Sequence, residues 1–217
     1  MVSSIKENYL FSSKDLIRLL IPLMIEQFLA VAVGMADSIM VASVGESAVS
    51  AVSLADSIMI LLINVFAALA TGGAVVAGQY IGQRQNGKAC ESGEQLITFV
   101  TFISVAVMII MYFGRNFILK TVFGSIEPDV EAYAKTYIMI VFSSIPFIAV
   151  YNSGAALFRA MGNSRITMIT SLIMNGINVF GNALLVYVAK LGVAGVAIPT
   201  LVSRAVAGRP LQVSGLE

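Results

Sequence analysis

Long apolar runs separated by short polar segments dominate the chain. A spanning helix needs roughly 20 mainly apolar residues, and five runs are long enough: residues 16–44, 49–81, 95–114, 132–157 and 166–189. A sixth run begins at Leu191 and stays apolar for about 17 residues, near the lower limit for a span. The pattern predicts an all-α protein, a polytopic transmembrane helix bundle with six spans in one lobe.

The runs also predict where the helices depart from straight spans. The first two exceed the minimum length, so we expect them to tilt or to extend beyond the bilayer. Pro22 and Pro146 lie inside the first and fourth runs, and each predicts a kink. Residues 115–131, between the third and fourth runs, mix charged and apolar side chains and should lie at the membrane interface.

Three segments follow from this division of the chain. Residues 1–15 form a polar N-terminal segment, residues 16–207 form the six-span lobe, and residues 208–217 form a short polar end. We expect the last segment to be a cloning remnant or a truncated tail, and a natural cytoplasmic tail is the alternative. The last span is then expected to be incomplete.

Lysine and arginine are unevenly distributed between the loops on the two sides. The N-terminal segment and the loops after the second and fourth runs carry Lys6, Lys14, Arg18, Arg84, Lys88, Arg159 and Arg165. The alternate loops carry Arg115, Lys120 and Lys190. Because positive charge is retained on the cytoplasmic side, we expect a multi-pass protein of the cell membrane with a cytoplasmic N-terminus.

Composition narrows the classes of partner. The chain is 58% hydrophobic and 12% charged, with a mean hydropathy of +0.91, so its surroundings are the lipid bilayer. A net charge of +1 argues against nucleic acid as a partner. The absence of histidine disfavours zinc and haem sites. The single cysteine, Cys90, cannot form an internal disulfide.

Acidic residues inside apolar runs are the first candidates for function, because a charge in hydrocarbon costs at least about 2.5 kcal/mol and usually faces the bundle interior. Glu26, Asp37 and Asp56 are such residues. Glu26 and Asp37 are eleven positions apart, which places them on one helix face within about 20°. We take Asp37 as functional, Glu26 as either a polar path or a packing seam, and Asp56 as more consistent with the membrane interface.

Polar side chains in the later runs form two further stripes. Ser171, Asn175, Asn178 and Asn182 recur at spacings of four, three and four, so they share one helix face. Such amides either join helices by hydrogen bonds or supply oxygen ligands to a hard cation. In the fourth run Tyr137, Ser144 and Tyr151 recur every seven residues, a pattern more typical of packing, and Tyr137 remains a candidate. Asn64 in the second run is a further candidate for a polar path.

The sequence lacks the motifs of an energy-consuming or hydrolytic enzyme. It has neither a phosphate-binding glycine loop followed by Lys and Ser or Thr nor a Gly-x-Ser-x-Gly turn, and it lacks a metal-ligand cluster. We therefore expect no catalytic residues and no enzyme activity. An ion gradient remains as the energy source, and a sodium ion is the only cofactor we consider.

Several motifs in order resemble those of the N-terminal half of a multidrug and toxic compound extrusion (MATE) transporter. They are MADSIMVASVG, GGAVVAGQYIGQRQNGKA, ALFRAMGNSRITM, NVFGNALLV and LGVAGVAIPTLVSR, and together the resemblance covers about 200 residues. The segment from Arg159 to Arg165 is the most specific of them.

The resemblance implies a fold of twelve spans in two six-span lobes, of which this chain is one. It implies a cleft between the lobes that opens alternately to each side, coupled to sodium or proton entry. It also implies that Asp37, Asn178, Thr200 and Tyr137 match residues of the cation-coupling cluster. Relatives with this cluster often have an acid where this chain has Asn182, which leaves Asp37 as the main charge.

Two physical routes could make Asp37 the coupling residue. Desolvation favours the protonated form of a carboxyl group, so Asp37 could carry a proton across. Alternatively its carboxylate and the Asn and Thr oxygens could hold a sodium ion. Either event neutralises the charge and lets the helices repack.

The leading hypothesis is thus one lobe of a cation-coupled antiporter that exports amphipathic or cationic organic compounds and needs a second six-span lobe. One alternative is a flippase for lipid-linked saccharides, for which Arg204 is the most suggestive residue. Another is a non-transporting membrane assembly fragment.

Overall fold

The computed structural model describes residues 13–122, 124 and 126–213, and these residues form helices joined by short connections. The helices are α1 (Ser13–Ala42), α2 (Glu46–Gly82), α3 (Asn86–Val122), α4 (Pro128–Phe142), α5 (Ile145–Ala160), α6 (Ser164–Ala183), the π-helical turn η1 (Leu184–Val188) and α7 (Ala194–Val213). Most of the predicted N-terminal segment, including Lys6, and the last four residues of the predicted tail lie outside the described residues.

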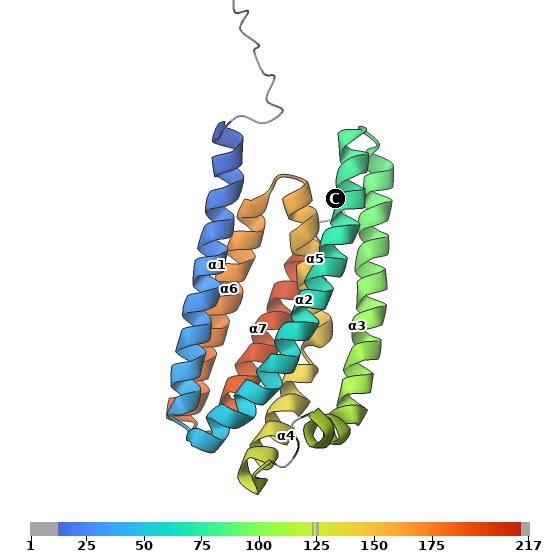
Figure 1. Ribbon diagram of the computed structural model, residues 1–217. Helices are drawn as coiled ribbons and strands as arrows, with labels where there is room; N and C mark the ends of the chain where they lie inside the picture. Colours follow the sequence, from blue (N-terminus) through green and yellow to red (C-terminus); the bar gives the residue numbers. More distant parts are fainter. Residues whose placement is uncertain (1–12, 123, 125, 214–217) are drawn as a thin grey trace, which may run out of the picture.

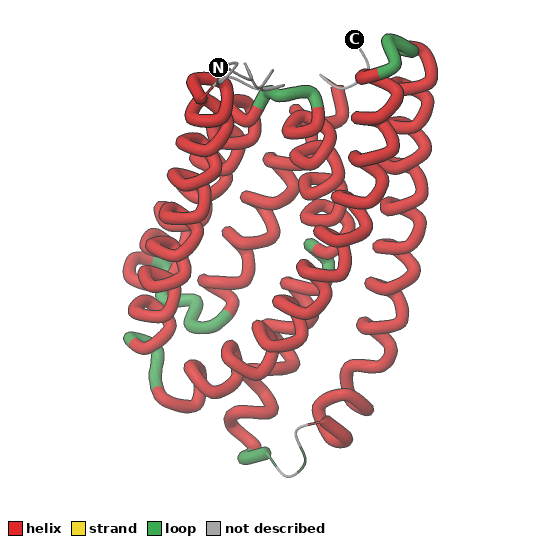
Figure 2. Tube along the Cα trace, turned by 45° about the horizontal axis from the view of Figure 1, so that its top comes forward, coloured by secondary structure: helices red, strands yellow, loops and turns green. Residues whose placement is uncertain are grey.

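The helices run side by side as one bundle (Figures 1 and 2). Helix α1 lies against α6, α2 packs on α3, α4 and α5, and α7 packs on α5 and α6. Many of the buried side chains of α2 are alanines, which let the neighbouring backbones approach closely. Gly73 of α2 receives the side chain of Leu96 from α3 in the same way. The α2 helix is therefore a central packing element.

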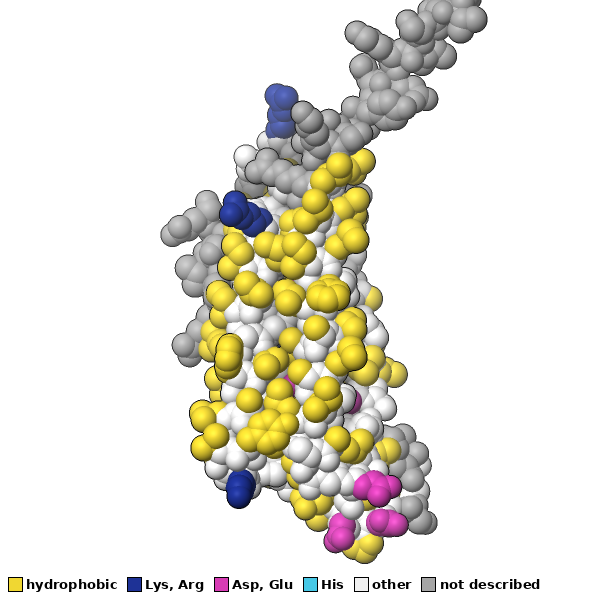
Figure 3. All heavy atoms as spheres, turned by 90° about the vertical axis from the view of Figure 1, so that its left-hand side faces the viewer, with side chains coloured by type: hydrophobic (Ala, Val, Ile, Leu, Met, Phe, Trp, Pro, Cys, Tyr) yellow, Lys and Arg dark blue, Asp and Glu magenta, His cyan; other side chains and the backbone are white. Residues whose placement is uncertain are grey.

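Large apolar side chains cover the outside of the bundle. On α1, Met24, Phe28 and Val31 have exposed fractions of 69%, 75% and 63%. Figure 3 shows hydrophobic side chains over most of the height of the face that includes α1. An outside as apolar as the inside is typical of a helix bundle in lipid. The protein is therefore a multi-pass membrane protein.

Within the described residues, four helices are long and apolar enough to cross a membrane, and the bent pair α4 and α5 gives a fifth span if it is counted as one. The pair bends by 45° between Phe142 and Ile145, next to Pro146, which confirms the predicted kink. Helix α1, in contrast, passes through Pro22 without a break. Helix α3 extends well beyond the predicted run at both ends and includes residues 115–122, which we expected in an interfacial segment.

The last helix differs from the sequence prediction. Its apolar part, Ala194–Gly208, is a shorter helix, as the sixth run predicts. The backbone nevertheless remains helical to Val213, so residues 208–213 continue α7 and do not form a separate polar end. Between α6 and α7 the π-helical turn η1 and the positive φ angles of Lys190 and Gly192 reverse the chain.

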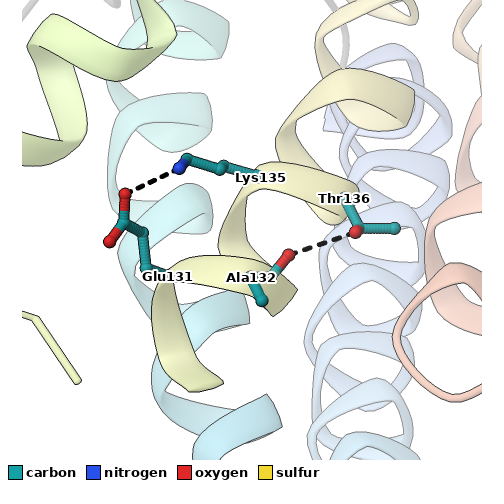
Figure 4. Close-up of polar contacts among 4 residues, drawn as sticks. All are labelled: Glu131, Ala132, Lys135 and Thr136. Atoms are coloured by element: carbon teal, nitrogen blue, oxygen red, sulfur yellow. Dashed lines mark hydrogen bonds and ion pairs between the residues drawn. The ribbon is translucent and has the colours of Figure 1, made fainter. Parts of the chain in front are cut away.

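Charged side chains gather at the two ends of the bundle. In Figure 3 acidic side chains cluster at the lower end, where α4 begins with Asp129 and Glu131 in its first turn. There Lys135 Nζ lies 2.7 Å from Glu131 Oε1 across one helical turn, and the Thr136 hydroxyl donates to the Ala132 carbonyl oxygen at 3.1 Å (Figure 4). An exposed ion pair of this kind contributes little to the stability of the fold, because solvent screens it.

Candidate functional site

A cluster of polar side chains from three helices surrounds Asp37. Asn182 Nδ2 of α6 donates to Asp37 Oδ1 of α1 at 2.7 Å and to Asn178 Oδ1 at 3.3 Å. Asn178 Nδ2 lies 3.0 Å from the hydroxyl of Thr200 on α7. Asn182 is fully buried, Asn178 and Thr200 are also buried, and Asp37 is half-buried. The structure thus brings four of the predicted residues into one hydrogen-bonded group.

The Asn178 amide fits this group in two orientations. In one, its nitrogen donates to Thr200 and its oxygen accepts from Asn182. In the other, its nitrogen donates to Asp37 Oδ1 at 3.1 Å and Oδ2 at 3.2 Å, and its oxygen accepts from Thr200 at 3.0 Å. The first orientation turns the amide oxygen toward the carboxylate, which is favourable only when a proton or a cation lies between the two acceptors.

The amide spacing and a close helix contact create this arrangement. Asn178 and Asn182 are one turn apart on α6, so their side chains lie above one another and face α1 and α7. Gly181, between them, lies against Pro199 of α7: a Cβ at Gly181 would come within 2.6 Å of the Pro199 Cβ. This close approach places the next residue, Thr200, beside Asn178.

The cluster is chemically suited to a hard cation or a proton. Asn182 Oδ1 is buried and accepts no hydrogen bond within the described residues. Together with Asp37, Asn178 and Thr200 it provides carboxylate, amide and hydroxyl oxygens, the ligand types that hard cations take. Within the same part of the chain, no three His, Cys, Asp or Glu side chains group as a transition-metal site would require. Asn182 gives the carboxylate of Asp37 a hydrogen-bond donor.

Tyr137, expected in the same cluster, makes its hydrogen bond elsewhere. Its hydroxyl donates to Asp56 Oδ1 of α2 at 3.1 Å, and the Tyr137 ring is buried. Near the bend after α4, Arg204 Nη1 of α7 donates to the Ser144 hydroxyl at 2.8 Å. Asp56, for which the sequence favoured the membrane interface, is half-buried and bonded to a tyrosine of another helix.

Glu26 lies in a separate cluster further toward the start of α1. It is 8% exposed and accepts a hydrogen bond from the Tyr151 hydroxyl of α5 at 3.2 Å. The Thr167 hydroxyl of α6 lies 3.4 Å from its second oxygen and 2.9 Å from the Ser164 carbonyl oxygen. In the described part of the chain Glu26 forms no salt bridge, and its hydrogen-bond partners are both hydroxyl groups.

The two remaining candidates differ in their surroundings. Asn175 is half-buried, and its Nδ2 donates to the Ser171 hydroxyl at 3.3 Å, one turn earlier on α6. Asn64 is exposed on α2 and makes no side-chain hydrogen bond within the described residues. The structure therefore places neither of them in the Asp37 cluster.

Thr167 is the functional candidate that the sequence analysis missed. It lies four residues before Ser171 and so extends the polar stripe of α6 by one turn, which is the signal that could have identified it. Tyr151 and Ser144 were interpreted as packing residues, and both are buried. Their hydroxyls also bond to Glu26 and Arg204, so the stripe of the fourth run combines packing with polar contacts.

Comparisons with known proteins agree with this architecture. The profile of the MatE family matches residues 22–184. An uncharacterized transporter, YisQ, of Bacillus subtilis (strain 168) is 30% identical over 192 residues, which are 85% of this chain and 41% of YisQ. A probable multidrug resistance protein, NorM, of Thermotoga maritima is 27% identical over 195 residues, which are 88% of this chain and 42% of NorM.

Solved structures match the same portion. An outward-facing multidrug resistance MATE family transporter of the MOP superfamily superposes with a TM-score of 0.86 at 23% identity, covering 91% of this chain and 44% of that chain. A MATE structure in the straight conformation gives a TM-score of 0.84 at 24% identity, with the same coverage. These likenesses show the fold. The chain spans less than half the length of the relatives it matches.

Proposed function

The chain belongs to the MatE family, and on this premise we propose that it is one lobe of a cation-coupled exporter of amphipathic or cationic organic compounds. The description of the Thermotoga relative as a probable multidrug resistance protein supports the substrate class. The share of each relative that the chain covers, 41–44%, supports a second six-span lobe as its partner. In this proposal a cleft between the lobes opens alternately to the two sides of the membrane.

The observation that carries the proposal is the oxygen-rich cluster around Asp37. The half-buried carboxylate of Asp37 accepts a hydrogen bond from Asn182, whose own amide oxygen is buried and accepts none within the described residues. A sodium ion among these oxygens would compensate the charge of Asp37, and a proton on the carboxylate would remove it. The unpaired oxygen of Asn182 gives the sodium ion a ligand that a proton does not need.

Ion binding at this cluster would act on helix packing. Asp37 belongs to α1, Asn178 and Asn182 to α6, and Thr200 to α7, so their hydrogen bonds join three helices. Neutralisation of Asp37 changes which of these bonds are favourable and shifts the equilibrium between helix arrangements. In the proposed exporter this shift couples ion entry to opening of the cleft.

The proposed orientation places the N-terminus in the cytoplasm of a cell membrane protein. The turns after α2 and α5 carry Arg84, Lys88, Arg159 and Arg165. The opposite end carries the acidic start of α4. This distribution supports a cytoplasmic side at the basic end. The relatives are described as transporters, so the comparisons do not favour the saccharide flippase or the non-transporting fragment.

The test is the thermal stability of the purified chain in detergent, in sodium or potassium and at several pH values. A ligand that binds only the folded state stabilises it, by about 2.7 kcal/mol at 100 times its dissociation constant. We expect either a sodium-specific or a pH-dependent stabilisation that is lost in Asp37→Asn. Glu26→Gln is the matched control, because it neutralises the other buried acid of α1 outside the cluster.

The two ions give different outcomes. Sodium-specific stabilisation would identify sodium, and a pH response without a sodium effect would identify the proton. If Asp37→Asn responds to both as the unmodified chain does, Asp37 is not the coupling group and the proposal is wrong.

A further inference from the structure

A cavity of about 440 Å³ lies between α2 and α5, away from the Asp37 cluster. Its α2 wall includes Ala67, Ala74 and Gly78, which share one helix face at spacings of seven and four. Small side chains on this face leave room that larger ones would fill. At one end the two helices meet closely, because a Cβ at Gly78 would lie 3.7 Å from the Ala160 Cβ. The cavity is thus a hollow that the packing leaves beside a tight contact.

The α5 wall supplies two polar side chains of the cavity, and Thr71 of α2 adds a hydroxyl that donates to the Ala67 carbonyl oxygen at 2.8 Å. Asn152, Ala156 and Arg159 follow at spacings of four and three, so they also share one face. Asn152 Nδ2 is buried and finds no hydrogen-bond acceptor within the described residues. Arg159 donates from Nε to the Ala155 carbonyl oxygen at 3.1 Å. Its two terminal nitrogens make neither a salt bridge nor a hydrogen bond to the described residues.

The balance of donors and acceptors defines the ligand class. The lining contains one guanidinium, one unpaired amide N–H and one threonine hydroxyl, and it contains no acidic side chain. A buried N–H without an acceptor is unfavourable, so a ligand with acceptor oxygens would satisfy the Asn152 amide. The rest of the lining is mainly alanine, glycine and valine, which suits an apolar portion.

The positions of Arg159 and Asn152 along the axis of α5 match the order of polar groups in one class of molecule. Arg159 lies in the last turn of α5, at the end of the bundle that also carries Arg84, Lys88 and Arg165. Asn152 lies seven residues deeper along the same helix, a rise of about 10 Å. A phosphoglyceride presents a phosphate at the headgroup level, ester carbonyl oxygens below it and then acyl chains, which is the order in which the cavity offers its groups.

We propose that this cavity binds an anionic phosphoglyceride of the surrounding leaflet, with the phosphate at Arg159 and an ester carbonyl at Asn152. The guanidinium favours phosphate through charge-assisted hydrogen bonds. Val75, which also lines the cavity, is 54% exposed, so the hollow opens at the surface of the bundle. This site involves neither Asp37 nor any residue hydrogen-bonded to it, so it stands independently of the coupling ion.

The test is a titration of the purified chain with phosphatidylglycerol or phosphatidylcholine, read by native mass spectrometry and thermal stability. We expect tighter binding of phosphatidylglycerol, and a loss of about tenfold or more in its apparent affinity in Arg159→Gln. Ala156→Leu keeps both polar groups and fills the hollow, so it should weaken both lipids. Arg165→Gln is the control, since Arg165 is exposed at the same end and does not line the cavity.

Three results would overturn the proposal. One is equal binding of the two lipids, and another is an equal loss in Arg159→Gln and Arg165→Gln, which indicates only general surface charge. The third is full stabilisation by soluble glycerol phosphate, which indicates a site for free anions and not for a membrane lipid. Asp37→Asn should bind phosphatidylglycerol normally, which separates this test from that of the coupling ion.

Discussion

Two acids on the same face of α1, Asp37 and Glu26, have different chemical surroundings. Asp37 lies beside side-chain amides, each of which offers both an N–H donor and a carbonyl oxygen. Glu26 is more deeply buried and lies beside the hydroxyls of Tyr151 and Thr167. Near Asp37 one amide oxygen accepts no hydrogen bond in the described part of the chain, whereas the Glu26 neighbours have no such oxygen.

The difference shows that charge and helix face alone do not define an ion site. Both acids satisfy the same sequence criterion, an acidic residue inside an apolar run. What separates them is the balance of donors and acceptors contributed by α5, α6 and α7. The carboxylate, amide and hydroxyl oxygens around Asp37, one of them unpaired, are suited to a cation, while the hydroxyl donors around Glu26 are suited to holding α1 in place.

The largest effect on stability is expected from removing the hydrogen bond between Tyr151 and Glu26. Tyr151→Phe removes the 3.2 Å hydrogen bond to a buried carboxylate. Hydrogen bonds to charged groups contribute about 1.5–3 kcal/mol, so the free energy of unfolding should fall by about that amount. Chemical unfolding in detergent measures the change. The loss should be equal in sodium and in potassium, and a loss that depends on sodium would mean that the two acids form one site.

The second prediction concerns the close contact between α6 and α7 beside the Asp37 cluster. Gly181→Ala places a Cβ within 2.6 Å of the Pro199 Cβ and forces α6 and α7 apart. Overpacking of this kind costs about 1–3 kcal/mol, and the separation should weaken the contact between Asn178 and Thr200. Unfolding experiments with and without the coupling cation measure both effects.

Gly176→Ala is the matched control for that substitution. Gly176 lies on the same helix, and a Cβ there meets nothing within 4 Å. We expect unchanged or slightly raised stability, because alanine favours a helix over glycine. If both alanine variants lose the same cation response, close packing at Gly181 is not what builds the cluster.

A smaller loss of stability is expected at a third acid, Asp56 of α2. Tyr137→Phe removes the 3.1 Å hydrogen bond to Asp56. Asp56 is half-buried and can be partly solvated, so the expected loss of unfolding free energy is about 1 kcal/mol, less than for Tyr151→Phe. Thermal melting of the two variants side by side measures the order. An unchanged cation response would keep Tyr137 outside the coupling cluster, and its loss would place Tyr137 inside.

The smallest effect is expected at Asn64. Its side chain is exposed and makes no hydrogen bond within the described residues, so Asn64→Ala should change stability by no more than about 0.5 kcal/mol. The same melting experiment measures it. A loss above 1 kcal/mol, on the order of a typical buried hydrogen bond, would show that this face of α2 packs against another surface in solution.

The sequence alone determined the helices and their approximate limits. Apolar runs of spanning length predicted five of the membrane segments, and Pro146 predicted the bend between α4 and α5. These features are local, because run length and proline geometry act within one helix. At the polar end of the chain residues 208–213 continue α7, since helical backbone can persist beyond the apolar stretch.

Which polar groups lie in contact depends on the tertiary structure. The spacing on α6 predicted that Asn178 and Asn182 share a face, and the family resemblance added Asp37 and Thr200, which the structure brings together. The sequence did not predict that the Tyr137 hydroxyl donates to Asp56 or that hydroxyls of α5 and α6 lie beside Glu26. Contacts between residues more than a hundred positions apart depend on the rotation and axial shift of each helix against its neighbours. Those quantities are set by close contacts such as Gly181 against Pro199, which no single helix encodes.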